Sequence, residues 1–327
     1  MSTQKLVIKF LLRLAAFCAL LIVLDFFIGY TLGKIYFNQR VGQFSQTTYA
    51  IDSAKQDIMV FGSSRAVRHY STGIISKELG ESCYNAGRDG QMIPYSAAVQ
   101  EVNVNRHIPK LIILDINPWE LAKDPSKYEK LTILLPYATE HKELISYISE
   151  VSQFERYKLY SKVYPYNSSI FILTTNALFP NAVRKDENGY LPLDGTMNQS
   201  QLEAYRTGME ARYLKIKNKK EVAEEKGIAY FKKFLDNTAK HNIKTIVVIS
   251  PTILKDPFYL DNQSLEKQLV MDISKTYPNV VFLDYSSDPR FYNHPEKFSD
   301  VFHLNRQGSE EYSTAFAQYI KASHLVE

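Results

Sequence analysis

The sequence lacks the features that would place it in several common protein classes. It has only two cysteines, Cys18 in an apolar run and Cys83 in an expected strand, so it has no disulfide framework and no cysteine metal site. No Gly-x-Gly-x-x-Gly follows the first expected strand, which disfavours a dinucleotide-binding domain. It shows neither an internal repeat nor a low-complexity segment.

The sequence also lacks a concentrated charge of one sign. Its formal net charge of +4 is spread through mixed-sign stretches such as residues 215–226, which are typical of a solvated helix face. A nucleic-acid partner is therefore not expected. His69 is expected to be structural. The other histidines outside the motifs described below show no pairing typical of a metal site: His107, His141, His241, His294 and His324. We expect no metal and no cofactor.

A long apolar run, residues 14–32, follows Lys5, Lys9 and Arg13. Its length suits a helix that crosses a bilayer, and the preceding positive charges predict a cytoplasmic N-terminus. Because no small-x-small cleavage site follows, residues 1–36 are expected to be an uncleaved anchor. The chain is thus predicted to be a single-pass membrane protein whose main domain lies outside the cytoplasm, in a periplasm or at an outer face.

Asp25 interrupts this apolar run. An acidic residue near the centre of a bilayer costs about 2.5 to 3.5 kcal/mol on insertion scales. Asp25 could face a polar partner within the membrane, or it could lie shallow enough to be hydrated. The sequence leaves both alternatives open.

Beyond a polar linker at residues 37–56, apolar runs alternate with helix-like segments. The expected strands are residues 58–61, 82–85, 111–116, 245–250 and 280–285. This alternation predicts a three-layer α/β/α, flavodoxin-like domain over residues 57–327, with about five mainly parallel strands. The regularity breaks at about residues 118–209, where a largely helical insertion is expected.

Two short strings near opposite ends of the chain carry residues typical of nucleophilic catalysis. Gly62-Ser63-Ser64 ends the first expected strand, and Asp300-x-x-His303 puts a carboxylate and an imidazole on one face of a helical turn. Together they could supply a nucleophile, a base and its orienting acid. Taken singly, each string has an ordinary structural explanation. The first is typical of a turn between a strand and a helix, and the second is typical of a helix N-cap aspartate with a nearby surface histidine.

Two intermediate strings strengthen this interpretation because each follows an expected strand. Residues 84–91 contain Gly87 and Gly90, whose backbone N–H groups could approach a ligand oxygen, and Asn117 follows the strand at 111–116. Gly90 and Asn117 are thus candidate donors to an oxyanion, although each singly reads as a turn residue. Asp115 is an alternative polar group on the same face as Asn117.

With these four strings in order, the chain resembles the SGNH/GDSL hydrolase superfamily over about residues 57–120 and 245–322. The resemblance implies Ser64 as nucleophile, His303 as base, Asp300 as orienter, and Ser64, Gly90 and Asn117 as oxyanion donors. Ser63 stands where the family usually has aspartate, and proline follows Asn117. With these departures the chain resembles a membrane-anchored branch of the superfamily. That branch includes the D-alanyl-lipoteichoic acid biosynthesis protein and is similar to alginate-type O-acetylation proteins.

The resemblance implies acyl transfer through an acyl-serine, with an acyl-ester substrate and an envelope glycan or lipid-linked polymer as the target. The triad does not distinguish a serine esterase from an O-acyltransferase. A multi-spanning membrane acyltransferase is an expected partner. Arg65, Arg68 and Arg88 could contact an anionic substrate, or they could be surface charge or pair with nearby acids. The alternative function is a catalytically inactive protein of this fold that supports assembly or binds glycans.

Overall fold

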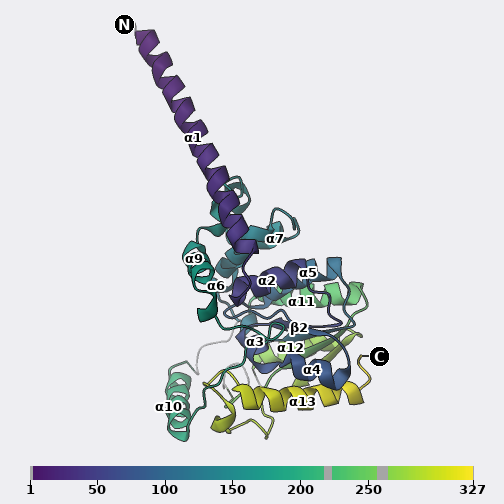
Figure 1. Cartoon of the computed structure of the whole chain (residues 1–327). Helices are drawn as coiled ribbons and strands as arrows, with labels where there is room; N and C mark the ends of the chain where they lie inside the picture. Colours follow the sequence, from purple (N-terminus) through teal and green to yellow (C-terminus); the bar gives the residue numbers. More distant parts are fainter. Residues whose placement is uncertain (1–2, 217–222, 256–263, 327) are drawn as a thin grey trace. The chain divides into compact units, whose positions relative to one another are not determined.

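The computed structural model describes residues 3–216, 223–255 and 264–326 (Figure 1). The chain divides into two compact units. The first combines residues 1–45 with 131–183, and the second combines residues 46–130 with 184–327. The stretch predicted as one insertion, residues 118–209, is therefore shared between the units.

The second unit contains a five-stranded parallel sheet. Its strands are β1 (Ile58–Gly62), β2 (Cys83–Asn85), β3 (Leu111–Asp115), β4 (Lys244–Ile249) and β5 (Val280–Asp284). They pair in the order β2-β1-β3-β4-β5, and every pair is parallel. This is the flavodoxin-like order, so the predicted fold class is confirmed. Each expected strand agrees with the observed one to within a residue at either end.

The strands form because their sequences are continuous apolar runs that can be buried on both faces. β1 and β3 are buried at every position, whereas the edge strand β5 is only partly buried. In the register, Ile58 lies opposite both Cys83 and Leu111, which makes β1 a central strand.

Helices cover both faces of this sheet (Figure 1). The helical elements of the second unit are α3 (Ser64–His69), α4 (Thr72–Leu79), α5 (Ile93–Arg106), η1 (Pro118–Leu121), α6 (Ser126–Glu129), α10 (Gln199–Ile216), α11 (Glu225–Lys240), α12 (Leu265–Lys275), η5 (Pro295–Lys297) and α13 (Arg306–Ala322). Helices α4 and α13 pack together, as do α5 and α11. The result is the three-layer arrangement expected from the alternating pattern.

The predicted linker contains a helix, α2 (Gly42–Asp52). Within the second unit, Ala50 and Ile51 of this helix are buried, and their carbonyl oxygens accept hydrogen bonds from Asn103 (3.2 Å) and Arg106 (3.1 Å) of α5. The glutamines, serine and threonines of this segment are the reason that the sequence predicts a polar linker here. A few apolar positions nevertheless suffice to bury one side of it.

The first unit is built around α1 (Thr3–Phe37). Its other elements are η2 (Lys130–Tyr137), α7 (Leu144–Ile148), α8 (Glu155–Lys158), η3 (Tyr164–Tyr166), α9 (Ile170–Leu178) and η4 (Pro180–Ala182). Among the described residues, α1 is the one helix long and apolar enough to cross a membrane, with a mean hydropathy of 2.5 over its most apolar window. Its 35 residues extend for about 52 Å, well beyond a hydrocarbon core of about 30 Å.

The C-terminal part of α1 packs closely against residues 161–166. A Cβ atom on Gly29 would lie 2.3 Å from the carbonyl carbon of Lys162, and one on Gly33 would lie 2.9 Å from the hydroxyl of Tyr166. Asp25 accepts hydrogen bonds from the Ser161 hydroxyl (2.5 Å) and the Lys162 backbone N–H (2.7 Å). Asp25 thus finds its partners in its own chain.

Candidate active site

Ser64 lies where β1 turns sharply into α3. The turn requires Gly62, which has a φ of +145° and whose added Cβ would lie 2.5 Å from the carbonyl oxygen of Asp115. Ser63 is the N-cap residue of α3 and is buried, as is Arg65, whereas Ser64 between them is partly exposed. The geometry of the turn therefore presents the second serine of the pair at the carboxyl edge of the sheet.

Ser64, His303 and Asp300 form a continuous chain of hydrogen bonds. The Ser64 Oγ lies 2.8 Å from His303 Nε2, and His303 Nδ1 lies 2.9 Å from both carboxylate oxygens of Asp300. With Nδ1–H donating to the carboxylate, Nε2 is the nitrogen that can accept the serine proton. This is the arrangement of a nucleophile, a base and an orienting acid.

The Asp300 carboxylate is held in its ionised form. Its Oδ1 atom also accepts hydrogen bonds from the backbone N–H groups of Phe302 (2.8 Å) and His303 (3.0 Å). Partial burial raises the pKa of Asp300, but the bond from the His303 ring and these backbone bonds outweigh it and leave the pKa below its ordinary value. Asp300 is therefore charged at neutral pH and can stabilise a protonated imidazole.

The sheet order explains why these residues meet at this edge. Because β2 and β3 lie on opposite sides of β1, the chain reverses direction across the sheet there, and a crevice forms outside the strand ends at such a point. The loop after β2 is tied to α3, since the Asn85 amide donates to the Ala66 carbonyl (2.7 Å) and the Arg88 N–H donates to the Gly62 carbonyl (3.1 Å).

Gly90 and Asn117 lie on the loops that follow β2 and β3. Gly90 is exposed in a turn with a φ of +72°, a conformation that favours glycine. Asn117 is the N-cap residue of η1, where its Oδ1 accepts a hydrogen bond from the Trp119 N–H (3.4 Å) and its own N–H donates to Glu120 (3.2 Å). Their role as oxyanion donors stays a prediction.

Asp115, the alternative to Asn117, lies inside the protein instead. It is 1% exposed and accepts a hydrogen bond from the Tyr70 hydroxyl (2.8 Å). Burial raises the pKa of its carboxyl group, and the Arg65 charge together with hydrogen bonds from Ser250 and Tyr70 opposes that rise. Asp115 therefore belongs to the polar interior beneath the site.

The three arginines considered as substrate contacts make contacts within the protein. Arg65 is 4% exposed and donates to the Ser250 hydroxyl (3.1 and 2.8 Å), and Arg88 is buried and donates to the Thr47 hydroxyl. Arg68 donates to the Leu191 carbonyl (2.7 Å) and pairs with Asp89 (2.5 Å). These guanidinium groups tie α3 to the segments around it, and Arg68 pairs with a nearby acid, which is the alternative that the sequence left open. Contact with an anionic substrate stays a prediction.

His69 is a residue of the site that sequence reasoning set aside as structural. It is fully buried, its Nε2 accepts a hydrogen bond from the Leu304 N–H (3.1 Å), and its Nδ1 lies 2.9 Å from the Ser250 hydroxyl. Nε2 is thus unprotonated and Nδ1–H donates to Ser250. Because Leu304 follows His303, this neutral imidazole positions the backbone that carries the base.

Replacing His69 with glutamine tests this role, because the glutamine oxygen can still accept from Leu304 but cannot titrate. Burial, and then the charges of Arg65 and His303, hold the pKa of His69 well below 6.5. As the pH falls below 6.5, the unfolded chain therefore binds a proton that the folded protein excludes. Wild-type protein should lose about 1.4 kcal/mol of unfolding free energy per pH unit from this group.

We expect His69→Gln to be less stable than wild type by about 1–3 kcal/mol at pH 7.5, through the lost bond to Ser250. The difference should shrink at pH 5.5. Denaturant titrations at the two pH values measure it, and a difference that is constant with pH would show that the pKa of His69 is the same in the folded and unfolded protein.

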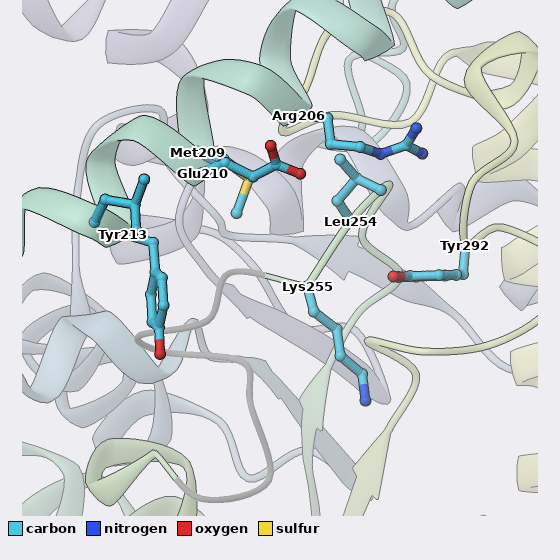
Figure 2. Close-up of a pocket in the computed structure, with 8 residues that line it drawn as sticks. Arg206, Met209, Glu210, Tyr213, Leu254, Lys255 and Tyr292 are labelled. Carbon is cyan, nitrogen blue, oxygen red and sulfur yellow. The ribbon is translucent and has the colours of Figure 1, made fainter. Parts of the chain in front are cut away.

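An aromatic pair lies beside the base, next to a surface hollow. Phe302 is 60% exposed and packs edge-on against Tyr205 of α10, with ring centroids 6.3 Å apart. The residue after Tyr205, Arg206, lines a surface hollow of about 510 Å³. Its lining comes from α10 (Arg206, Met209, Glu210, Tyr213 and Leu214) and from two loops (Leu254, Lys255 and Tyr292), as Figure 2 shows. None of the three triad residues lines this hollow.

Comparison with known proteins gives only distant likenesses. No family model and no curated protein sequence matches the chain. Among solved structures, it is similar to a "putative platelet activating factor" from Streptococcus pneumonia, with 11% identity over 94% of this chain and 99% of that chain and a TM-score of 0.38. It is also similar to a "putative acylhydrolase" from Bacteroides fragilis, with 11% identity over 85% and 95% and a TM-score of 0.41. Function is therefore inferred from the residues of the site.

Proposed function

We propose that the chain is a serine esterase or O-acyltransferase of the SGNH type. The observation that supports this most directly is the hydrogen-bonded chain from Ser64 through His303 to Asp300 at the carboxyl edge of β1. A serine hydroxyl is a weak nucleophile unless a base accepts its proton, and this geometry supplies that base together with a charged group to orient it.

In the proposed reaction, the Ser64 Oγ attacks the carbonyl carbon of an ester or thioester while His303 Nε2 takes the serine proton. The tetrahedral intermediate collapses, the bond to the leaving oxygen or sulfur breaks, and His303 returns the proton to that atom. The resulting acyl-serine passes its acyl group to water in hydrolysis, or to an acceptor hydroxyl in transfer. Asp300 keeps the imidazole in the required tautomer throughout and stabilises its positive charge.

The proposed oxyanion donors are the backbone N–H groups of Ser64 and Gly90 and the side-chain amide of Asn117. In Asn117, the cap occupies Oδ1, so the NH₂ group remains as a donor to a developing oxyanion. Removing one such donor typically lowers the rate by about a hundred- to a thousandfold.

The proposed substrate is an acyl ester on a cell-envelope glycan or lipid-linked polymer. Support comes from α1, whose length and composition suit a membrane anchor with the sheet-bearing unit on the outer side. The exposed Phe302, which packs against the partly buried Tyr205, offers aromatic surface beside His303 that suits a sugar ring. A multi-spanning acyltransferase that exports the acyl group is the proposed partner.

A complementation experiment tests this function. In cells that lack the gene, wild-type protein should restore the normal ester-linked acyl content of envelope glycans, and Ser64→Ala should leave it unrestored at an equal protein level. Acyl release by mild alkali followed by chromatography gives the measurement. Full restoration by Ser64→Ala would instead indicate a non-catalytic assembly or glycan-binding role.

A further inference from the structure

Three large aromatic side chains are exposed together on a short part of the first unit, residues 154–162. Phe154 is 58% exposed, Tyr157 is 51% exposed and Tyr160 is 84% exposed. Exposing several aromatic side chains this close together to water is energetically unfavourable. Such apolar patches usually mark an interaction surface.

The charges within residues 154–162 indicate what kind of surface this is. Arg156, Lys158 and Lys162 alternate with the aromatic residues. The one acidic residue, Glu155, is buried and satisfied by Lys158 (2.5 Å) and the Tyr164 hydroxyl (2.7 Å). Aromatic rings with polar tips, interspersed with lysine and arginine, are the composition enriched at the boundary between lipid and water.

The position of these residues along α1 is set by direct contacts. Asp25 accepts hydrogen bonds from Ser161 and Lys162, and Gly29 lies against the Lys162 backbone with no room for a side chain. The run of exposed large apolar residues in α1 extends from Leu6 to Tyr30, which as a helix measures about 38 Å and is therefore long enough to cross a hydrocarbon core of about 30 Å. Residues 154–162 are therefore fixed at the C-terminal end of this apolar part.

We propose that residues 154–162 are seated in the headgroup region of the outer lipid leaflet, with Phe154, Tyr157 and Tyr160 in contact with lipid. Because Ser161 and Lys162 contact Asp25 of α1, this inference rests on α1 crossing the membrane but not on the catalytic proposal. A helix that is apolar on all sides can slide and rotate in a bilayer. Residues 154–162 would fix the depth of α1 in the bilayer at the outer leaflet. They would place Asp25 at the interface, where its hydrogen-bond partners and water stabilise the charge of its carboxylate.

An environment-sensitive fluorophore tests this seating in the full-length protein. Cys18→Ala removes the exposed cysteine, while Cys83 stays in place because burial raises the pKa of its thiol and leaves it unreactive. Tyr160→Cys then carries an NBD label in vesicles of phosphatidylcholine and phosphatidylglycerol. The matched control is Ile108→Cys, an apolar residue of the second unit that is 56% exposed.

The label at position 160 should emit at shorter wavelength than the label at 108. Lipids carrying a shallow nitroxide should also quench it roughly threefold more strongly, as expected for a side chain at the interface. Because these vesicles contain no other protein, such shielding can come only from lipid. Equal, water-like emission and equal quenching at the two positions would overturn the proposal and leave the aromatic surface to a protein partner.

Discussion

Replacing Ser64 with alanine is expected to lower the turnover of an aryl ester by about 10⁴-fold or more, because the acyl group then has no oxygen to which it can transfer. The residual rate would come from binding and oxyanion stabilisation alone. Since Ser64 is partly exposed and its hydroxyl contacts His303, which belongs to the site, folding should be unaffected. Release of the aryl alcohol by purified full-length protein in detergent measures the effect.

The neighbouring serine provides a matched control. Ser63 is buried as the N-cap residue of α3, and its side chain makes no capping hydrogen bond. Ser63→Ala should therefore keep turnover within a few-fold of wild type, since it leaves the nucleophile in place. The assignment would be wrong if Ser63→Ala lost the activity and Ser64→Ala kept it.

Asp300→Asn is expected to lower kcat by about 10⁴-fold, the effect typical of forcing the wrong histidine tautomer. Oδ1 of Asp300 accepts from the Phe302 and His303 backbone N–H groups, so the asparagine oxygen should take its place. The asparagine NH₂ then replaces Oδ2 and faces His303 Nδ1, which favours the tautomer in which Nδ1 is an acceptor. His303 Nε2 consequently carries the proton and cannot receive one from Ser64.

A second histidine and carboxylate pair offers the control for this substitution. His294 Nδ1 lies 2.8 Å from Glu296, and both side chains are exposed. Glu296→Gln makes the same chemical change a few residues away, and turnover should stay within a few-fold of wild type. Comparable kcat values for Asp300→Asn and Glu296→Gln would exclude Asp300 as the group that orients the base.

Much of the fold follows from the sequence because the strands are local apolar runs with turn residues between them. The runs at 58–61 and 111–116 became β1 and β3 almost unchanged. The helix α2 within the predicted linker was not anticipated, because its buried residues Ala50 and Ile51 lie among polar residues. The division into two units could not be predicted, because it depends on contacts such as that between Asp25 and Ser161, which are 136 residues apart.

The triad residues could be predicted because each lies in a short sequence motif. Ser64 and His303 are 239 residues apart, yet each carries a recognisable neighbour pattern, and the structure brings them within hydrogen-bonding distance. The contacts of the three arginines could not be predicted, because sequence does not show in which direction a side chain points from a short helix. The contacts that make His69 structural could not be predicted either, since they involve Leu304 and Ser250 from distant segments.

The central claim, that Ser64 is an activated nucleophile, is tested most directly by covalent labelling of the full-length protein with a fluorophosphonate. Mass spectrometry of the digested protein should find one phosphonyl group on the peptide that contains Ser63 and Ser64, with fragment ions placing it on Ser64. His303→Ala should lose most of this labelling, because the hydroxyl then has no base. A folded protein that stays unlabelled, or that carries the label on another serine, would contradict the account.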